Sequence, residues 1–317
     1  MRFRVKTVGL SSINKKDNTF RITTAEDIDD LANSIHNVGL VNLPLLLESA
    51  GNYIIVCGFR RIKACQHLKW SSVEARILDS ETKKLECIKL AITDNAYQRP
   101  LNLIEKSRAI NLLADFITKS DSLAKEMSLL GLTESRSSVD KIKMICHFSP
   151  AIQKSILSNT ISLTMALELG KLPGDSVESF VKLFDHLKLS LNKQREIFTF
   201  VKEIALRDDI PIPRVLEDKH LQEILSRDDF DRNQKIRKIR IYLKQLRFPV
   251  LTKAEKTFEK HKTKLKLGKG TKFVPPDYFE GSTFTLQFSF KNFNELKERQ
   301  TTFDEIIKNP ALKKILN

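Results

Sequence analysis

Hydrophobic and polar positions follow two different periods in the first third of the chain. Between residues 27 and 38 apolar side chains recur at helical spacing, and Gly39 follows in the position of a C-cap. Two short apolar runs, Leu43–Leu47 and Tyr53–Cys57, are separated by the turn-prone stretch Ser49–Asn52, which predicts strand, turn and strand. After them we expect a helix from Gly58 to about Leu68, a strand at Val73–Leu78 and a helix from Glu81 to about Asn95.

The middle of the chain has a different pattern. From about Asn102 to Leu225, amphipathic helical segments follow one another with short connections, such as the break at Ser149–Pro150. This pattern favours an all-helical DNA-binding domain over a second enzyme core. The next stretch is predicted to be partly helical up to Leu246 and broken at Pro249.

Near the C-terminus, residues Thr283–Lys291 alternate apolar and polar side chains, and a helical segment follows from about Asn292 to Lys308. One strand and one helix bury too little surface to be stable alone, so we expect a homodimer. The expected fold is α+β, in four parts: a small mixed α/β domain (1–100), an all-helical domain (101–225), a basic linker (226–275) and a small α/β dimerisation element (276–317).

Positive charge is concentrated in one stretch of the sequence. Of the net charge of +15, most comes from residues 232–272, which hold fifteen Lys or Arg and only two acids, Glu255 and Glu259. Such a block attracts a polyanion by releasing counterions, and double-stranded DNA is the commonest intracellular candidate. The alternative is a solvated basic face without a partner.

Other features exclude several classes of protein. No run approaches the roughly 18 apolar residues that a membrane span requires, and Met1–Leu10 lacks a signal-peptide core. We therefore expect a cytoplasmic protein without membrane contact, and the expected DNA partner would make it nucleoid-associated. The four cysteines show no C-x-x-C spacing, so they predict reduced, mostly buried thiols rather than a zinc site or disulfides.

The first candidate site follows the strand Tyr53–Cys57. Gly58, at a strand-to-helix turn, would let an anion approach the backbone, and the helix start would direct free N–H groups toward it. Arg60 and Arg61 could add charge-assisted contacts, so the segment suits a phosphate. Two arginines in a first helical turn can also be ordinary surface residues.

The second candidate site begins at Asp94 and Asn95, which offer the hard oxygen ligands that Mg²⁺ prefers. Arg99 could contact a phosphate. Asn102 and Glu105 have the spacing of a capping box for the next helix, and this local role competes with a functional one.

In their order and spacing, these segments resemble the N-terminal domain of ParB-type partition proteins, over roughly residues 10 to 110. The family patterns are G-x-x-x-P, G-E-R-R-x-x-A and E-N-x-x-R-x-x-L-N-x-x-E. The resemblance implies a site for CTP and Mg²⁺. The nucleotide-binding residues that it implies are Gly39, Asn42, Pro44, Gly58, Phe59, Arg60, Arg61 and Arg99, and the implied metal ligands are Asp94 and Asn95.

The sequence also departs from the family patterns. Phe59 replaces a glutamate associated with nucleotide turnover, which argues against hydrolysis; weak CTPase activity stays open and no catalytic residue is assigned. Asp94 replaces a glutamate, and Leu43 and Leu103 replace prolines. We find no long N-terminal arm of the kind that stimulates a ParA-type ATPase, so the sequence does not support that partner.

The resemblance further implies a helix-turn-helix. We expect its first helix at Leu123–Met127 and its recognition helix at Ser135–Lys143, with Val139 and Ile142 facing inward. The connection Ser128–Glu134 is about three residues longer than usual, so the register stays open, and a plain amphipathic helix pair is the alternative. The candidate DNA contacts are Ser135, Arg136, Ser137, Ser138, Lys141 and Lys143.

The leading hypothesis is a CTP-gated dimeric DNA clamp that acts in chromosome or plasmid segregation. One alternative is an enzyme on the same fold, such as a nuclease, a small-molecule kinase or a sulfiredoxin-like reductase. Sulfiredoxins place their cysteine where Phe59 stands, whereas Cys57 comes two residues earlier, and few carboxylates accompany Asp94. The other alternative is a transcriptional regulator that never binds nucleotide.

Overall fold

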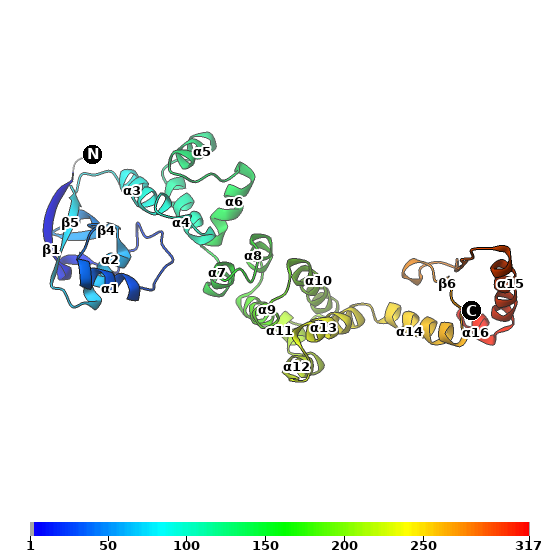
Figure 1. Cartoon of the computed structure of the whole chain (residues 1–317). Coiled ribbons are helices and arrows are strands. Elements are labelled where there is room, and N and C mark those ends of the chain that lie inside the picture. The colour runs from blue at the N-terminus through cyan, green and yellow to red at the C-terminus, as the bar shows by residue number, and fades with distance from the viewer. Residues whose placement is uncertain (1–2, 317) are drawn as a thin grey trace. The chain divides into compact units, whose positions relative to one another are not determined.

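The structure is a computed structural model that describes residues 3–316. The chain divides into two compact units, which meet between Gln194 and Arg195 and are described separately (Figure 1). Among the described residues, no helix is both long enough and apolar enough to cross a membrane.

The first unit begins with a mixed five-stranded sheet in the order β1-β5-β3-β4-β2. The antiparallel pairs are β1 with β5 and β3 with β4, whereas β3 pairs with β5, and β2 with β4, in parallel. The strands are β1 (Arg4–Gly9), β2 (Ile13–Asn14), β3 (Leu45–Ser49), β4 (Asn52–Cys57) and β5 (Ser72–Leu78). The predicted strand, turn and strand are confirmed as β3 and β4; β1 and β2 were not predicted.

Three helices complete this α/β part: α1 (Asp29–Val38), α2 (Phe59–His67) and α3 (Lys84–Ala96). The apolar stripe of α1 packs with α2 and the sheet in one core, where Ile35, Leu46, Ile62 and Ile77 are almost fully buried. Burial of these side chains is the main stabilising contribution, roughly 1.5–3 kcal/mol for each large aliphatic residue. The predicted mixed α/β domain is confirmed.

The rest of the first unit is helical, as predicted. Its helices are α4 (Leu103–Ala114), α5 (Ser120–Leu129), α6 (Arg136–Ile145), α7 (Pro150–Leu157), α8 (Leu163–Leu169) and α9 (Gly174–Leu187), and α10 (Leu191–Asp208) leads into the second unit. Helix α4 packs against α6 and α7. The buried Ser107 of α4 ties it to α6, because its hydroxyl donates to the carbonyl of Lys143 and accepts from the N–H of Cys146.

The basic stretch in the second unit, expected from the sequence as a linker, contains the helices α13 (Arg232–Arg247) and α14 (Pro249–Lys264). A capping box of Asp231 and Gln234 starts α13, and α14 follows after Phe248. The helix breaks at the predicted proline but resumes at once, because proline at the first helical position loses only an N–H that has no intrahelical partner. The helix expected up to Leu246 is confirmed as α13, whereas the sequence pattern did not predict α14. The shorter helices α11 (Ile212–Leu216) and α12 (Lys219–Ser226) precede α13.

The C-terminal strand and helix are not alone within the chain. Strand β7 (Thr285–Phe288) pairs with β6 (Thr271–Val274), and α15 (Phe293–Lys308) is followed by α16 (Pro310–Leu316). Phe258 of α14 packs against Phe273 and Phe284, at ring-centroid distances of 5.5 and 6.2 Å. These contacts form a small aromatic core that the sequence pattern did not predict. Dimerisation through this element stays a prediction.

Candidate functional site

The turn between β4 and α2 leaves the start of a helix open. Gly58 has a φ of 94° and a ψ of 29°, and a Cβ at this position would lie 3.0 Å from Cβ of Pro44. The backbone conformation and the close approach therefore both require glycine. No side chain caps α2, so the N–H groups of its first turn are available to an anion.

Arg61 connects three segments of the domain. Its guanidinium forms an ion pair with Asp94 (Nη2 to Oδ2, 3.0 Å) and donates to the carbonyls of Asn42 and Leu43 at 3.0 and 3.1 Å. Its side chain is only 14% exposed. The two candidate segments, 58–61 and 94–99, are thus held directly against each other.

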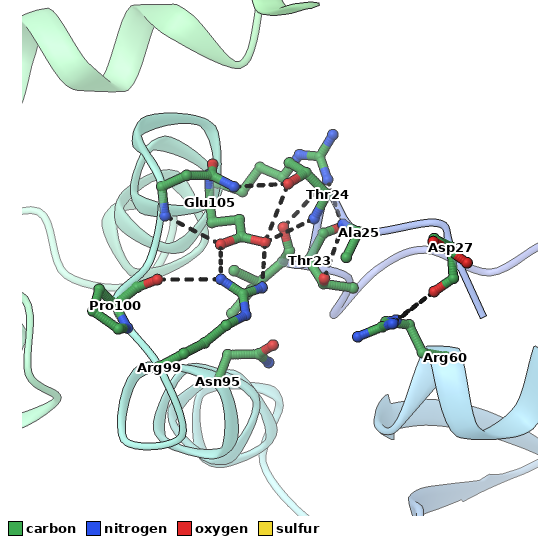
Figure 2. Close-up of polar contacts among 12 residues, drawn as sticks. Thr23, Thr24, Ala25, Asp27, Arg60, Asn95, Arg99, Pro100 and Glu105 are labelled. Atoms are coloured by element: carbon green, nitrogen blue, oxygen red, sulfur yellow. Dashed lines mark hydrogen bonds and ion pairs between the residues drawn. The ribbon is translucent and has the colours of Figure 1, made fainter. Parts of the chain in front are cut away.

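Arg60 has a different environment. It donates through Nε and Nη2 to the backbone carbonyl of Asp27, at 3.0 and 2.6 Å (Figure 2). Within residues 3–316 no carboxylate forms an ion pair with it. Its positive charge is therefore held in place but not neutralised.

A cavity of about 240 Å³ lies between these segments. Eight of the site residues inferred from the sequence line it: Asn42, Gly58, Phe59, Arg60, Arg61, Asp94, Asn95 and Arg99. The other two do not: Gly39 is the C-cap of α1, with a φ of 79°, and Pro44 packs beneath Gly58. The structure thus brings most, but not all, of the inferred residues to one place.

The chemistry of the residues that line the cavity suits a phosphate group bound together with Mg²⁺. The Nδ2 of Asn95 donates to the carbonyl of Ala91 at 2.8 Å, which leaves its side-chain oxygen as the free acceptor beside Asp94. No group of three or more His, Cys, Asp or Glu suited to a metal occurs in residues 3–316, and Mg²⁺ commonly takes one or two protein groups plus phosphate oxygens and water. The cavity is smaller than the roughly 300 Å³ at which sites for whole drug-sized ligands begin, so it suits the phosphates better than an entire nucleotide.

Arg99 is engaged inside the fold. Counted from Asn95, the arginine of the E-N-x-x-R pattern falls on Gln98, which donates to Asp94 at 3.2 Å, and not on Arg99. Arg99 instead forms a bidentate ion pair with Glu105, with both N–O distances at 2.7 Å (Figure 2). Its charge is therefore largely compensated before any ligand binds.

Glu105 is a residue whose importance the sequence did not reveal. The predicted capping box with Asn102 is confirmed, but the same carboxylate also accepts from Arg99 and from both the N–H and the hydroxyl of Thr24. Burial would raise the pKa of Glu105, but the hydrogen bonds from Arg99, Thr24 and Asn102 outweigh it and lower the pKa to about 2. A fully buried carboxylate thus stays ionised and links α4 to the segment around Thr24.

We name residues 18–26 the strap. Phe20, Ile22 and Thr23 of the strap line the cavity, and Thr24 also accepts a 2.8 Å hydrogen bond from Nδ2 of Asn102. The strap contains no helix or strand, and its sequence has no apolar period. The hydrophobic pattern of the sequence therefore gives no signal that would identify these residues.

Cys57 also borders the cavity, at the end of β4. Burial, together with the negative charge of Asp94, raises the pKa of its thiol to about 12. A thiol that stays protonated is a poor nucleophile. The geometry therefore argues against a sulfiredoxin-like reaction at this position.

The helix pair α5 and α6 lies in the region where a helix-turn-helix was expected. Ile142 is buried and Val139 half-buried, and Ser135 is the N-cap residue, although its hydroxyl contacts Ser137 and Ser138 instead of the backbone. Arg136 forms an ion pair with Asp121 of α5. Of the candidate DNA contacts, Ser135, Arg136, Ser137 and Lys141 are exposed, and Ser138 and Lys143 are half-buried. DNA readout by α6 stays a prediction.

The geometry defines a class: a mixed α/β domain with a phosphate-sized cavity, followed by helices. Comparison with known families agrees, since residues 2–96 match the family model of the ParB N-terminal domain. This match confirms, for the N-terminal part of the chain, the resemblance seen in the motifs.

The curated relatives have two kinds of name. A probable chromosome-partitioning protein ParB of Helicobacter pylori is 26% identical over 196 residues, which are 61% of this chain and 65% of that protein. A nucleoid occlusion protein of Bacillus licheniformis is 30% identical over 198 residues, 61% of this chain and 66% of that protein. The matches thus span about two thirds of the length of these relatives.

Two solved structures of C-terminally truncated ParB from Caulobacter crescentus are also similar. The complex with the centromeric parS site shares 21% identity, covers 60% of this chain and 96% of that chain, and has a TM-score of 0.34. The complex with CTP-gamma-S shares 22% identity and has a TM-score of 0.27. The match covers 57% of this chain and 98% of that chain. TM-scores this low carry no argument about how the domains are arranged.

Proposed function

We propose that this chain is a DNA-binding partition protein whose N-terminal domain binds CTP with Mg²⁺, and that nucleotide binding gates a dimeric clamp around DNA. The observation that carries the proposal is the single cavity lined by both Gly58–Arg61 and Asp94–Asn95. The match to the family model of the ParB N-terminal domain supports it.

Within this proposal, each residue at the cavity has a chemical role. The open start of α2 and the uncompensated Arg60 would bind phosphate oxygens, and Asp94 with the side-chain oxygen of Asn95 would hold Mg²⁺. When bound, Mg²⁺ supplies charge neutralisation between the phosphates and Asp94. Arg61 would then exchange its ion pair with Asp94 for contacts to the ligand.

That exchange offers a physical basis for gating. A ligand shifts a conformational equilibrium only as far as it binds one state better than the other. Because Arg61 joins α2 to Asp94 of α3, a ligand that competes for both side chains would change the coupling between these helices. Phe59 places no carboxylate at the cavity, so we expect nucleotide binding without rapid hydrolysis.

The DNA-binding part of the proposal is supported by exposure and charge. The exposed residues of α6 would read a site, and the basic helices α13 and α14 would hold DNA without sequence preference. The protein would act on the nucleoid, in the cytoplasm, in segregation of a chromosome or plasmid.

The dimer is supported by an apolar groove of about 520 Å³ on β7 and α15. Phe290, Phe293 and Phe303, which line it, are 51%, 66% and 42% exposed. A contiguous exposed aromatic patch of this kind is typical of a protein interface. A second copy of the same element is the proposed occupant.

Calorimetric titration of the whole protein with CTP and Mg²⁺ tests the proposal. We expect saturable binding that Arg60→Ala weakens at least tenfold, because the uncompensated cation is lost, while binding of a short DNA duplex is unchanged. Lys182→Gln, an exposed lysine on α9 away from the cavity, is the matched control. Absence of heat with every nucleoside triphosphate would remove nucleotide gating from the proposal.

One observation favours a second candidate, a nucleotide-independent DNA-binding regulator. Arg61 and Arg99 are already neutralised by Asp94 and Glu105, so two of the three arginines at the cavity need no ligand. The lifetime of the protein on closed circular DNA separates the two functions. A clamp stays longer on the circle when CTP is added, whereas a regulator dissociates at the same rate with or without it.

A further inference from the structure

The strap has a second side. Its residues Arg21, Thr24 and Glu26 border a separate cleft of about 830 Å³, whose remaining walls come from α4 and the segment 146–157. Thr23 borders both this cleft and the cavity described above. We name it the strap cleft; it lies entirely within the first unit.

Arg108 of α4 is a half-buried cation in the strap cleft. Its Nη1 donates to the carbonyls of Ile22 and Thr23 at 3.2 and 3.0 Å. In the described part of the chain, no carboxylate forms an ion pair with Arg108. Its charge has thus lost part of its hydration, and the groups that accept its hydrogen bonds are neutral carbonyls, an arrangement that a bound anion would improve.

Arg21 contributes a second guanidinium to the same cleft. It pairs with the exposed Glu26 through a single contact of 3.3 Å, and its Nε is buried without a hydrogen-bond partner. A buried donor without an acceptor in the protein is rare, and this one is available to an acceptor oxygen of a ligand.

The electrostatics of the strap cleft favour an anion. Burial is the main cause that lowers the pKa of Arg108, and repulsion by the positive charge of Arg21 lowers it further, whereas the negative charges of Glu105 and Glu26 act in the opposite direction. The exposed Lys154 adds a third positive charge, and the carboxylates among the lining residues are Glu26 and Asp115. An anion with several acceptor oxygens would relieve the repulsion and satisfy the free donor on Arg21.

We propose that the strap cleft binds a phosphoryl group between Arg21 and Arg108. Planar guanidinium groups match the oxygens of a phosphate, and a tetrahedral anion can accept from two of them at once. The group could belong to a small phosphate compound or to the backbone of bound DNA, since both present the same oxygens. The site is separate from the cavity at Gly58 and does not depend on CTP binding there.

The test is calorimetric titration of the full chain with inorganic phosphate, against chloride at the same ionic strength. Arg21→Gln and Arg108→Lys should weaken binding at least tenfold, and Lys182→Gln should leave it unchanged. Arg21→Gln should cause the same loss of phosphate binding in the wild type and in an Arg60→Ala background, which separates this site from the proposed nucleotide cavity. Arg21→Gln keeps the bonds from Arg108 to the strap, so it stays informative if Arg108→Lys fails to fold.

A second arm identifies the source of the phosphoryl group. Duplex DNA binding is measured at several salt concentrations for the wild type and Arg21→Gln. If inorganic phosphate does not bind but the salt dependence of Arg21→Gln falls by about one phosphate contact, the group belongs to DNA and the proposal stands. If neither phosphate binding nor the salt dependence differs between wild type and variants, the proposal is wrong.

Discussion

Arg61 and Asp94 form a 3.0 Å ion pair between the start of α2 and the end of α3, and both side chains are largely buried, at 14% and 23% exposure. The pair joins the two sequence segments that were selected on chemical grounds. It is also the contact that a phosphate and a metal ion would have to share. Changes to it should therefore alter both the stability of the domain and the proposed response to a ligand.

Asp94→Asn should destabilise the protein. It removes the charge that compensates Arg61, and we expect a loss of about 1–3 kcal/mol, the range for leaving a partly buried polar group poorly paired. Urea unfolding at neutral pH measures the change in the free energy of unfolding. The same variant should lose the Mg²⁺ dependence of nucleotide binding. Unchanged stability and unchanged Mg²⁺ dependence would together show that the pair is incidental.

Glu105→Gln should change how stability depends on pH. The pKa of Glu105 is lowered from 4.5 to about 2 in the folded protein. Its ionised form therefore stabilises the fold above pH 4.5, and this contribution is lost as the pH falls from 4.5 towards 2. At pH 7 the free energy of unfolding of the variant should be lower by roughly 2 kcal/mol. This loss is smaller than for a fully buried ion pair, because Arg99 is partly exposed to solvent.

The difference in the free energy of unfolding between the wild type and Glu105→Gln should become smaller below pH 4.5. Urea unfolding at pH 7, 5, 4 and 3 follows it directly. A difference that stays constant over this range would mean that the carboxylate charge does not contribute, and that only the shape of the side chain matters.

The fold was largely predictable where local pattern decides it. The hairpin of β3 and β4, the glycine turn at Gly58 and the capping box of Asn102 each depend on residues close in sequence. Their formation therefore follows from the hydrophobic period of the segments and from the residues that turns and helix caps require. The same holds for the helical middle of the chain.

The parts that could not be predicted depend on contacts far apart in sequence. Glu105 contacts Thr24 across 81 positions in the sequence, and Phe258 packs against Phe273 and Phe284, which lie in later segments of the chain. No period in the strap indicates that it covers the cavity. Arg99 was selected by its type, whereas its partner Glu105 is visible only in three dimensions.

Gly58→Ala and Gly39→Ala form a matched pair. Both glycines have positive φ, 94° and 79°, but a Cβ on Gly58 would lie 3.0 Å from Pro44, whereas a Cβ on Gly39 would meet nothing within 4 Å. Each change should lower the free energy of unfolding by about 1 kcal/mol or more through backbone strain. In calorimetric titration, only Gly58→Ala should also weaken nucleotide binding, because its methyl group disturbs the start of α2. Equal effects of both variants on binding would contradict a site at this turn.

Phe293→Asp tests the apolar groove on β7 and α15. Phe293 is 66% exposed within one chain, so a charge there should not unfold the element, but it should oppose burial against a second copy. We expect sedimentation velocity to show a dimer for the wild type and a monomer for the variant, with thermal unfolding of dilute protein little changed. Val250→Asp is the control, because Val250 is 82% exposed on α14 and does not line the groove. If the wild type sediments as a monomer, or if both variants dissociate equally, the groove is not the dimer interface.

Loss of the dimer in Phe293→Asp alone would also shorten the lifetime of the protein on circular DNA, since a clamp needs both subunits to close.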